Sequence, residues 1–138
     1  MTRLSAVCGL AAVLAGSVPP AMGQARTSHL VRLVADSAER SYRFEPATVS
    51  ARPNDVVIFR VESGSAHSVV FEGSGLAPQV RAALNRALPG RVGDLRGPLL
   101  IGEGTEYRVI VPAIPKGNYA FFCLPHRAYD MRGELKVR

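Results

Sequence analysis

The stretch Asn118-Tyr-Ala-Phe-Phe122-Cys123-Leu-Pro-His126-Arg-Ala-Tyr-Asp-Met131-Arg-Gly-Glu134-Leu-Lys-Val-Arg138 decides the fold of this chain. Its first five residues are rich in aromatic side chains and favour a strand, and its last five alternate between charged and apolar residues, which also favours a strand. Cys123, His126 and Met131 fall between these two runs, within nine positions. The pattern predicts a loop that is held at both ends by strands and carries three possible metal ligands.

These three side chains are a mixed set of donors. A thiolate and a thioether are soft ligands and an imidazole is intermediate, so together they suit copper, which has to be held both as Cu(I) and as Cu(II). The spacing Cys-x-x-His-x-x-x-x-Met, with Pro125 before the His and Gly133 after the Met, resembles the copper loop of plastocyanins and of the wider cupredoxin family. The resemblance extends from about His29 to Arg138.

The resemblance implies a complete copper site. The family takes a further ligand from an upstream strand end, and Ser65-Ala-His67-Ser-Val-Val-Phe71 is similar to that segment. Residue by residue, the equatorial ligands match His67, Cys123 and His126, and the long axial ligand matches Met131. One type 1 copper ion is the implied cofactor.

Two positions beside these ligands depart from the family. Many members have Asn after the first His and Ser or Thr after the Cys, and these side chains tie the two ligand segments together. This chain has Ser68 and Leu124 at those positions. Since such bonds orient the ligands, we expect the tie between the segments to be altered.

The first 25 residues have the features of an export signal. Arg3 supplies a positive start, residues 4–18 are apolar, and Pro19-Pro20 ends that run before small residues that suit cleavage. The apolar run is too short to span a bilayer comfortably, and Cys8 lies inside it, which argues against a lipoprotein. We therefore expect a signal peptide at 1–25, a cupredoxin domain at 26–138, and a periplasmic or secreted protein.

Removal of the leader sharpens the case for a metal site. The remaining 113 residues suffice for one domain and contain one cysteine, one methionine and three histidines. In an oxidising compartment a single cysteine has no disulfide partner, so Cys123 is either reactive or bound to a metal.

The rest of the chain predicts an all-β Greek-key β-sandwich of about eight strands with one short helical insertion. Within Asp55–Glu62, Val57, Phe59 and Val61 share one face. The spacing of the apolar residues at 77–88 predicts the helix, with Pro78 in its first turn and Pro89-Gly90 after it. The other expected strands are 29–35, 42–45, 48–50, 68–72, 99–101, 105–111, 117–123 and 135–137.

Each candidate ligand also has a plainer interpretation. Cys123 suits a small buried core residue, and a Cys with a His suits a cysteine protease, although no nucleophile signature surrounds it. His67 at a strand start suits the surface, Met131 suits loop packing, and His29 is expected at a surface or strand edge. A copper oxidase or nitrite reductase needs further histidine-rich centres, and only His29 is left over.

We therefore expect an electron shuttle, not an enzyme, that cycles between Cu(II) and Cu(I) and docks on transient redox partners such as a c-type cytochrome or a copper oxidoreductase. A periplasmic copper carrier or chaperone with the same ligands is the alternative, and a metal-free binding module is a third possibility. We expect a monomer without stable membrane insertion. His126, bordered by Leu124, Pro125, Ala128 and Tyr129, is the expected electron gate.

The basic charge of the chain does not indicate nucleic acid. The net charge is +6, or +5 without the leader, and fifteen of the seventeen basic residues are Arg. They are scattered from Arg32 to Arg138 with acidic residues between them, whereas nucleic-acid-binding proteins gather them in a patch. Attraction to an acidic protein or an anionic membrane surface is one consequence, and an Arg-rich solvated surface is the other.

Overall fold

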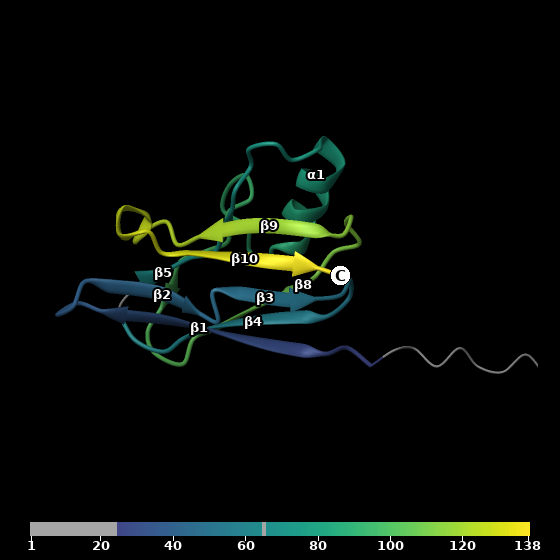
Figure 1. Ribbon diagram of the computed structural model, residues 1–138. Helices are drawn as coiled ribbons and strands as arrows, with labels where there is room; N and C mark the ends of the chain where they lie inside the picture. The colour runs from purple at the N-terminus through teal and green to yellow at the C-terminus, as the bar shows by residue number, and fades with distance from the viewer. Residues whose placement is uncertain (1–24, 65) are drawn as a thin grey trace, which may run out of the picture.

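The computed structural model describes residues 25–64 and 66–138. They form two four-stranded sheets that pack face to face, with one helix beside them (Figure 1). One sheet has the strand order β2-β1-β4-β8, from Ser41–Glu45, Ser28–Asp36, Val56–Val61 and Glu106–Ile110. The other has the order β3-β10-β9-β6, from Thr48–Ala51, Arg132–Val137, Gly117–Phe122 and Val70–Phe71.

Two shorter elements complete the strands. β5 (Ala66–His67) pairs with β7 (Leu100–Ile101) in a separate two-stranded sheet. The described residues therefore contain ten strands, against about eight expected. β7 lies within the strand predicted at 99–101, whereas β5 was not predicted, because two residues are too few to show a period of two. His67 also ends a strand of its own, which corrects the expectation that it precedes a strand at 68–72.

The sandwich and its helical insertion confirm the predicted fold class. β10 lies between β3 and β9 although it is last in the chain, and β1 runs parallel to β4, so the connections cross between the sheets. α1 (Pro78–Ala87) begins with a proline in its first turn and buries Val80 and Leu84 against the core. Among the described residues no helix is both long and apolar enough to cross a bilayer.

The core follows from alternation along the strands. In β4 every second residue is buried, with Val57, Phe59 and Val61 inward, as predicted. The ring centroids of Phe59 and Phe121 lie 5.4 Å apart, and the rings pack edge to face. This contact joins the two sheets. β9 and β10 then carry the chain from this core to a loop at one end of the sandwich, while the C-terminus lies at the other end (Figure 1).

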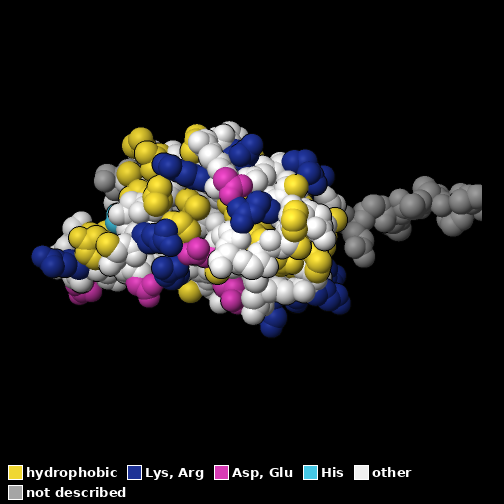
Figure 2. Space-filling view, turned by 90° about the horizontal axis from the view of Figure 1, so that it is seen from above, with side chains coloured by type: hydrophobic (Ala, Val, Ile, Leu, Met, Phe, Trp, Pro, Cys, Tyr) yellow, Lys and Arg dark blue, Asp and Glu magenta, His cyan; other side chains and the backbone are white. Residues whose placement is uncertain are grey.

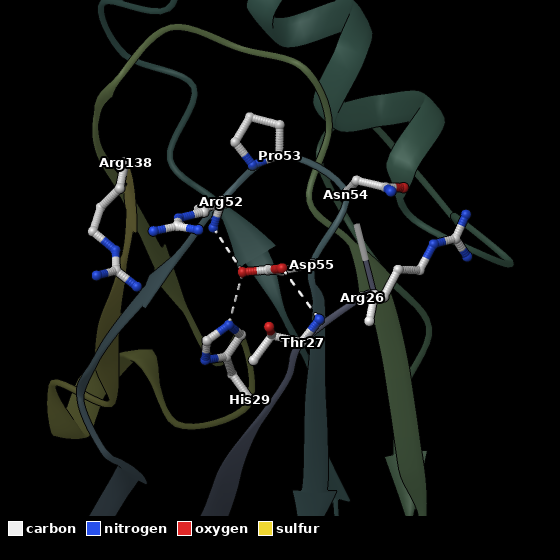
Figure 3. A pocket seen from close by; sticks show the side chains of 9 residues that line it. Arg26, Thr27, His29, Arg52, Pro53, Asn54, Asp55 and Arg138 are labelled. Atoms are coloured by element: carbon white, nitrogen blue, oxygen red, sulfur yellow. Dashed lines mark hydrogen bonds and ion pairs between the residues drawn. The ribbon is translucent and has the colours of Figure 1, made fainter. Parts of the chain in front are cut away.

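Asp55 ties the chain together at the end of the sandwich opposite this loop. Its carboxylate accepts hydrogen bonds from the Arg52 N–H (2.9 Å), the His29 Nε2–H (3.0 Å) and the Thr27 N–H (3.3 Å) (Figure 3). These donors, led by the Arg52 N–H, hold the pKa of the Asp55 carboxyl below its ordinary value. Asp55 and its three partners line a pocket of about 500 Å³, together with Arg138.

The surface is a mixture of both charges, as the scattered sequence positions predicted. Figure 2 shows Lys and Arg side chains spread over one face with acidic side chains beside them. Within the described part of the chain seven arginines pair with an acidic side chain. Exposed pairs of this kind contribute little to stability individually, so their main effect is to even out the charge.

We expect Asp55→Asn to lower the free energy of unfolding of the copper-free protein by about 1–2 kcal/mol at neutral pH, because a charged acceptor is lost. The folded pKa lies below the unfolded value near 4, so the contribution is complete above about pH 4 and is lost as the pH falls through the folded pKa. Urea unfolding of both proteins between about pH 3 and about pH 7 measures this difference.

The matched control is Glu103→Gln, since Glu103 is exposed and makes no ion pair with any described residue. This variant should unfold like the wild type throughout. A difference for Asp55→Asn that stays constant into acid would contradict the role of the charge.

Candidate metal centre

Three of the predicted ligand side chains meet at the loop end of the sandwich. The Cys123 Sγ atom lies 3.7 Å from the Nδ1 atom of His67 and 3.4 Å from the Nδ1 atom of His126. The three donor atoms all lie within 4.8 Å of one another. Residues that are 56 positions apart in the chain therefore form one cluster.

Each histidine reaches the cluster from a different element. His67 ends β5, where pairing with Leu100 of β7 fixes the backbone, and its side chain is fully buried. Cys123 follows β9 directly and is also fully buried. His126 lies three residues further on, before the short 3₁₀ helix η1 (Arg127–Tyr129), and is partly exposed.

A hydrogen bond on the far side of the His67 ring sets its tautomer. The Nε2 atom lies 2.8 Å from the backbone oxygen of Ser63, and only a protonated nitrogen can bond to a carbonyl. The Nδ1 atom is then left with its lone pair facing Cys123. Metal-binding histidines in proteins are oriented in this way by their second ring nitrogen.

Gly64 makes room for this arrangement. It has a φ of +88°, and an added Cβ atom would lie 2.5 Å from the Ala35 Cβ and 3.3 Å from the His67 Nε2. A larger residue would need both a strained backbone and a shift of neighbouring groups. The glycine therefore allows the chain to turn close behind the His67 ring.

The two ligand segments are tied together through Ser68. Its N–H points to the Cys123 Sγ at 3.4 Å, and its Oγ accepts a hydrogen bond from the Leu124 N–H at 3.0 Å. As expected, Ser68 and Leu124 alter the groups that form the tie, but the tie itself is present. The serine hydroxyl and the Leu124 backbone, which needs no side chain, maintain the link.

The loop from Cys123 to Met131 is closed by backbone hydrogen bonds. The Cys123 N–H donates to the Met131 oxygen at 3.0 Å, and the Met131 N–H donates to the His126 oxygen at 3.3 Å. The Met131 side chain is fully buried at the end of this loop. Asp130 beside it has a φ of +58° and points outward to Arg132, so its carboxylate is directed away from the cluster.

Burial favours the uncharged forms of the three side chains. It lowers the pKa of His67, and burial together with the neighbouring His67 lowers the pKa of His126. Burial also raises the pKa of the Cys123 thiol, although hydrogen bonds from Ser68 and His126 oppose this effect. Two neutral imidazoles and a thiol that must lose its proton on binding are the form in which such residues take up a metal ion.

The donor set and its spacing suit one copper ion. Transition-metal bonds to imidazole nitrogen and thiolate sulfur are about 2.0 to 2.3 Å long, so the donors of one three-coordinate site lie roughly 3.5 to 4 Å apart. The distances from Cys123 to both histidines are close to this spacing. Two imidazoles and one thiolate are also the equatorial donors typical of blue-copper sites.

His29 lies apart from the cluster, at the other end of β1, where it bonds to Asp55. This confirms its predicted place at a strand edge. Tyr42 of β2 was not predicted as part of the site, but its ring stacks on His126 with centroids 4.1 Å apart. The alternation of Tyr42 with Phe44 indicates that they share a face, but nothing in it identifies the loop that Tyr42 contacts.

Comparison of the whole sequence with known proteins also indicates a copper-binding protein. Residues 31–138 match the family model described as copper binding proteins, plastocyanin/azurin family. A plastocyanin from Lactuca sativa is 29% identical over 101 residues, which cover 73% of this chain and 93% of that protein. A plastocyanin from Vicia faba is 27% identical over 107 residues, 78% of this chain and 99% of that protein.

Solved structures share the fold. The oxidised plastocyanin of Dryopteris crassirhizoma superposes with a TM-score of 0.63 at 23% identity and covers 80% of this chain and 100% of its own. A reduced amicyanin variant gives a TM-score of 0.55 at 21% identity, with 83% and 85% covered. Since the family match spans most of the chain and both candidate ligand segments, this protein belongs to the plastocyanin/azurin family of copper-binding proteins.

Proposed function

We propose that this protein is a carrier of single electrons with one type 1 copper ion, held by His67, Cys123 and His126 and, along the axis, by Met131. The observation that carries the proposal is the convergence of two imidazole Nδ1 atoms on one buried thiol. Membership of a copper-binding family supports it. The buried Met131 side chain, at the end of the loop that begins with Cys123, supports the fourth ligand.

The bound copper would supply a one-electron couple between Cu(II) and Cu(I). The residues contribute a frame that changes little between the two states, because strands β5 and β9 and the Ser68 hydrogen bonds hold the donors from both sides. A carrier of this kind needs no substrate pocket and performs no reaction of its own, so we do not assign an enzymatic activity.

His126 is the proposed route for electrons. His67 is fully buried, whereas the His126 ring is partly exposed and is surrounded by exposed apolar residues. Leu124 is 37% exposed and Tyr129 48%, and Pro125 and Ala128 are also exposed. A small apolar surface of this kind suits brief docking of a redox partner.

The proposed partners are redox proteins such as a c-type cytochrome or a copper oxidoreductase. The net charge of +5 that remains without residues 1–25 favours an acidic docking surface on the partner. We propose that the carrier acts as a monomer, because transient electron exchange requires the His126 surface to be free.

We further propose export, with residues 1–25 as a signal peptide and residues 26–138 as the functional domain. Residues 1–24 lie outside those that the structure describes, so this proposal depends on the charge and hydrophobicity pattern of the sequence. The proposed location is the periplasm or the exterior. A relative from Pisum sativum is named plastocyanin, chloroplastic. That name points to the chloroplast, which differs from the location proposed for this protein.

Cys123→Ser should abolish the strong visible absorption that Cu(II) is expected to give with the wild-type protein, because the absorption arises from charge transfer between thiolate and metal. Titration of the purified protein with Cu(II), followed by visible and EPR spectra, measures this. A wild-type protein that binds one copper ion and stays colourless would overturn the thiolate assignment.

Met131→Gln should lower the reduction potential and keep the visible band, because a thioether favours soft Cu(I) more than an amide oxygen does. Cyclic voltammetry of the two proteins at one pH provides the measurement. An unchanged potential would return Met131 to a role in loop packing.

Leu124→Glu should slow electron exchange with a redox partner without changing the visible spectrum, because it places a charge beside His126. The matched control is Ile101→Glu, since Ile101 is 68% exposed and pairs with Ala66, next to His67. Stopped-flow mixing with a partner protein gives both rates. If the Ile101 variant is the slower one, electrons pass on the His67 side.

A further inference from the structure

The His126 ring is held differently from the His67 ring. His67 is anchored by the hydrogen bond from its Nε2 atom to Ser63. In the part of the chain that the structure describes, the His126 ring makes a polar contact only through Nδ1, to Cys123. A single polar contact at one ring atom leaves the plane of the ring undetermined, so the packing of neighbouring rings has to set it. The His67 ring lies close by, with centroids 4.9 Å apart, but it is tilted by 55° and does not stack on His126.

The ring that stacks on His126 is that of Tyr42. The two ring centroids lie 4.1 Å apart and the planes differ by only 16°. Tyr42 lies on β2, in the sheet opposite β9, so the contact joins the ligand loop to the other half of the sandwich. Because Tyr42 alternates with the buried Phe44, its side chain faces the interior at the end where the loop closes.

A second ring from the same loop packs on Tyr42. The centroids of Tyr42 and Tyr129 lie 4.6 Å apart with the planes inclined at 40°. The N–H of Tyr129 donates to the His126 oxygen at 3.0 Å, which places the two loop residues on adjacent turns of backbone. Tyr42 therefore contacts the loop through two rings, one of which is a candidate ligand.

We propose that Tyr42 is a positioning residue for the copper site: its ring holds the His126 imidazole in the plane that directs Nδ1 towards Cys123 before any metal binds. The proposal rests on the proposed ligand role of His126. Orienting a ligand beforehand removes part of the entropy cost of binding and slows release, because the ring cannot readily turn away.

The ring of Tyr42 carries this role, not its hydroxyl. The hydroxyl makes no hydrogen bond to any residue in the ranges 25–64 and 66–138, whereas the ring faces make both contacts. Phenylalanine should therefore substitute for Tyr42, and leucine, which is apolar but smaller and has no flat face, should not. An aromatic pair of this kind biases an equilibrium roughly two- to tenfold.

The test compares Tyr42→Phe and Tyr42→Leu with the wild type. In the copper-free proteins, NMR of the His126 ring protons should show the upfield shift of a stacked ring in wild type and Tyr42→Phe, and its loss in Tyr42→Leu. In the Cu(I) proteins, release to a Cu(I) chelator should be roughly two- to tenfold faster for Tyr42→Leu only. Visible spectra after reoxidation check that the ligands are intact.

Tyr129→Ala gives an independent measurement if Tyr42→Leu does not fold, since Tyr129 is exposed on a short turn. Removing this ring leaves the Tyr42 ring with one neighbour, so copper release should quicken, but less than in Tyr42→Leu. Unchanged release in both variants, or a Tyr42→Phe protein that behaves like Tyr42→Leu, would overturn the proposal.

The copper-free NMR arm separates this proposal from the function on which it rests. If the wild type shows no copper-dependent band, the ligand assignment fails even though the ring shift of His126 is present. If the band is normal and the ring shift is absent in the wild type, the positioning role of Tyr42 fails alone.

Discussion

Two hydrogen bonds through Ser68 hold together the parts of the chain on which the copper site depends. One runs from its N–H to the Cys123 Sγ and the other from the Leu124 N–H to its Oγ. They join the segment between β5 and β6 to the residues that follow β9, more than fifty positions further along the chain. The pairing of Val70 with Phe122 brings β6 and β9 together, and the Ser68 bonds then set the separation between His67 and Cys123 at the end of that pairing. Directional bonds tolerate small shifts less readily than packing does.

The two histidines divide the requirements of an electron carrier between them. His67 is fully buried, anchored through Nε2 and backed by Gly64, so it contributes rigidity. His126 is partly exposed and is held by a ring stack, which fixes its plane and leaves one edge accessible. A stack suits this position because it orients a ring at the surface without enclosing it, whereas an added hydrogen-bond partner would cover the exposed nitrogen.

The opposite end of the sandwich has a structural role. There Asp55 accepts three hydrogen bonds and ties β1 to the turn before β4. β9 and β10 connect the two ends, and their pairing from Phe122–Arg132 to Gly117–Val137 makes the ligand loop an extension of the core. The precision of the site therefore depends on the whole length of the sandwich.

The sequence by itself determined the fold class and the candidate donors. Cys123, His126 and Met131 are near neighbours in one loop, so their spacing carries chemical information without any knowledge of the fold, and the alternation in β4 predicts which residues are buried because the period of a strand is two. The tautomer of His67, the Ser68 tie, the Tyr42 stack, and the short strand β5 with its pairing to β7 were decided only by the tertiary structure. Each of these is a contact between residues that local periodicity does not relate, and the register between distant strands sets which side chains meet.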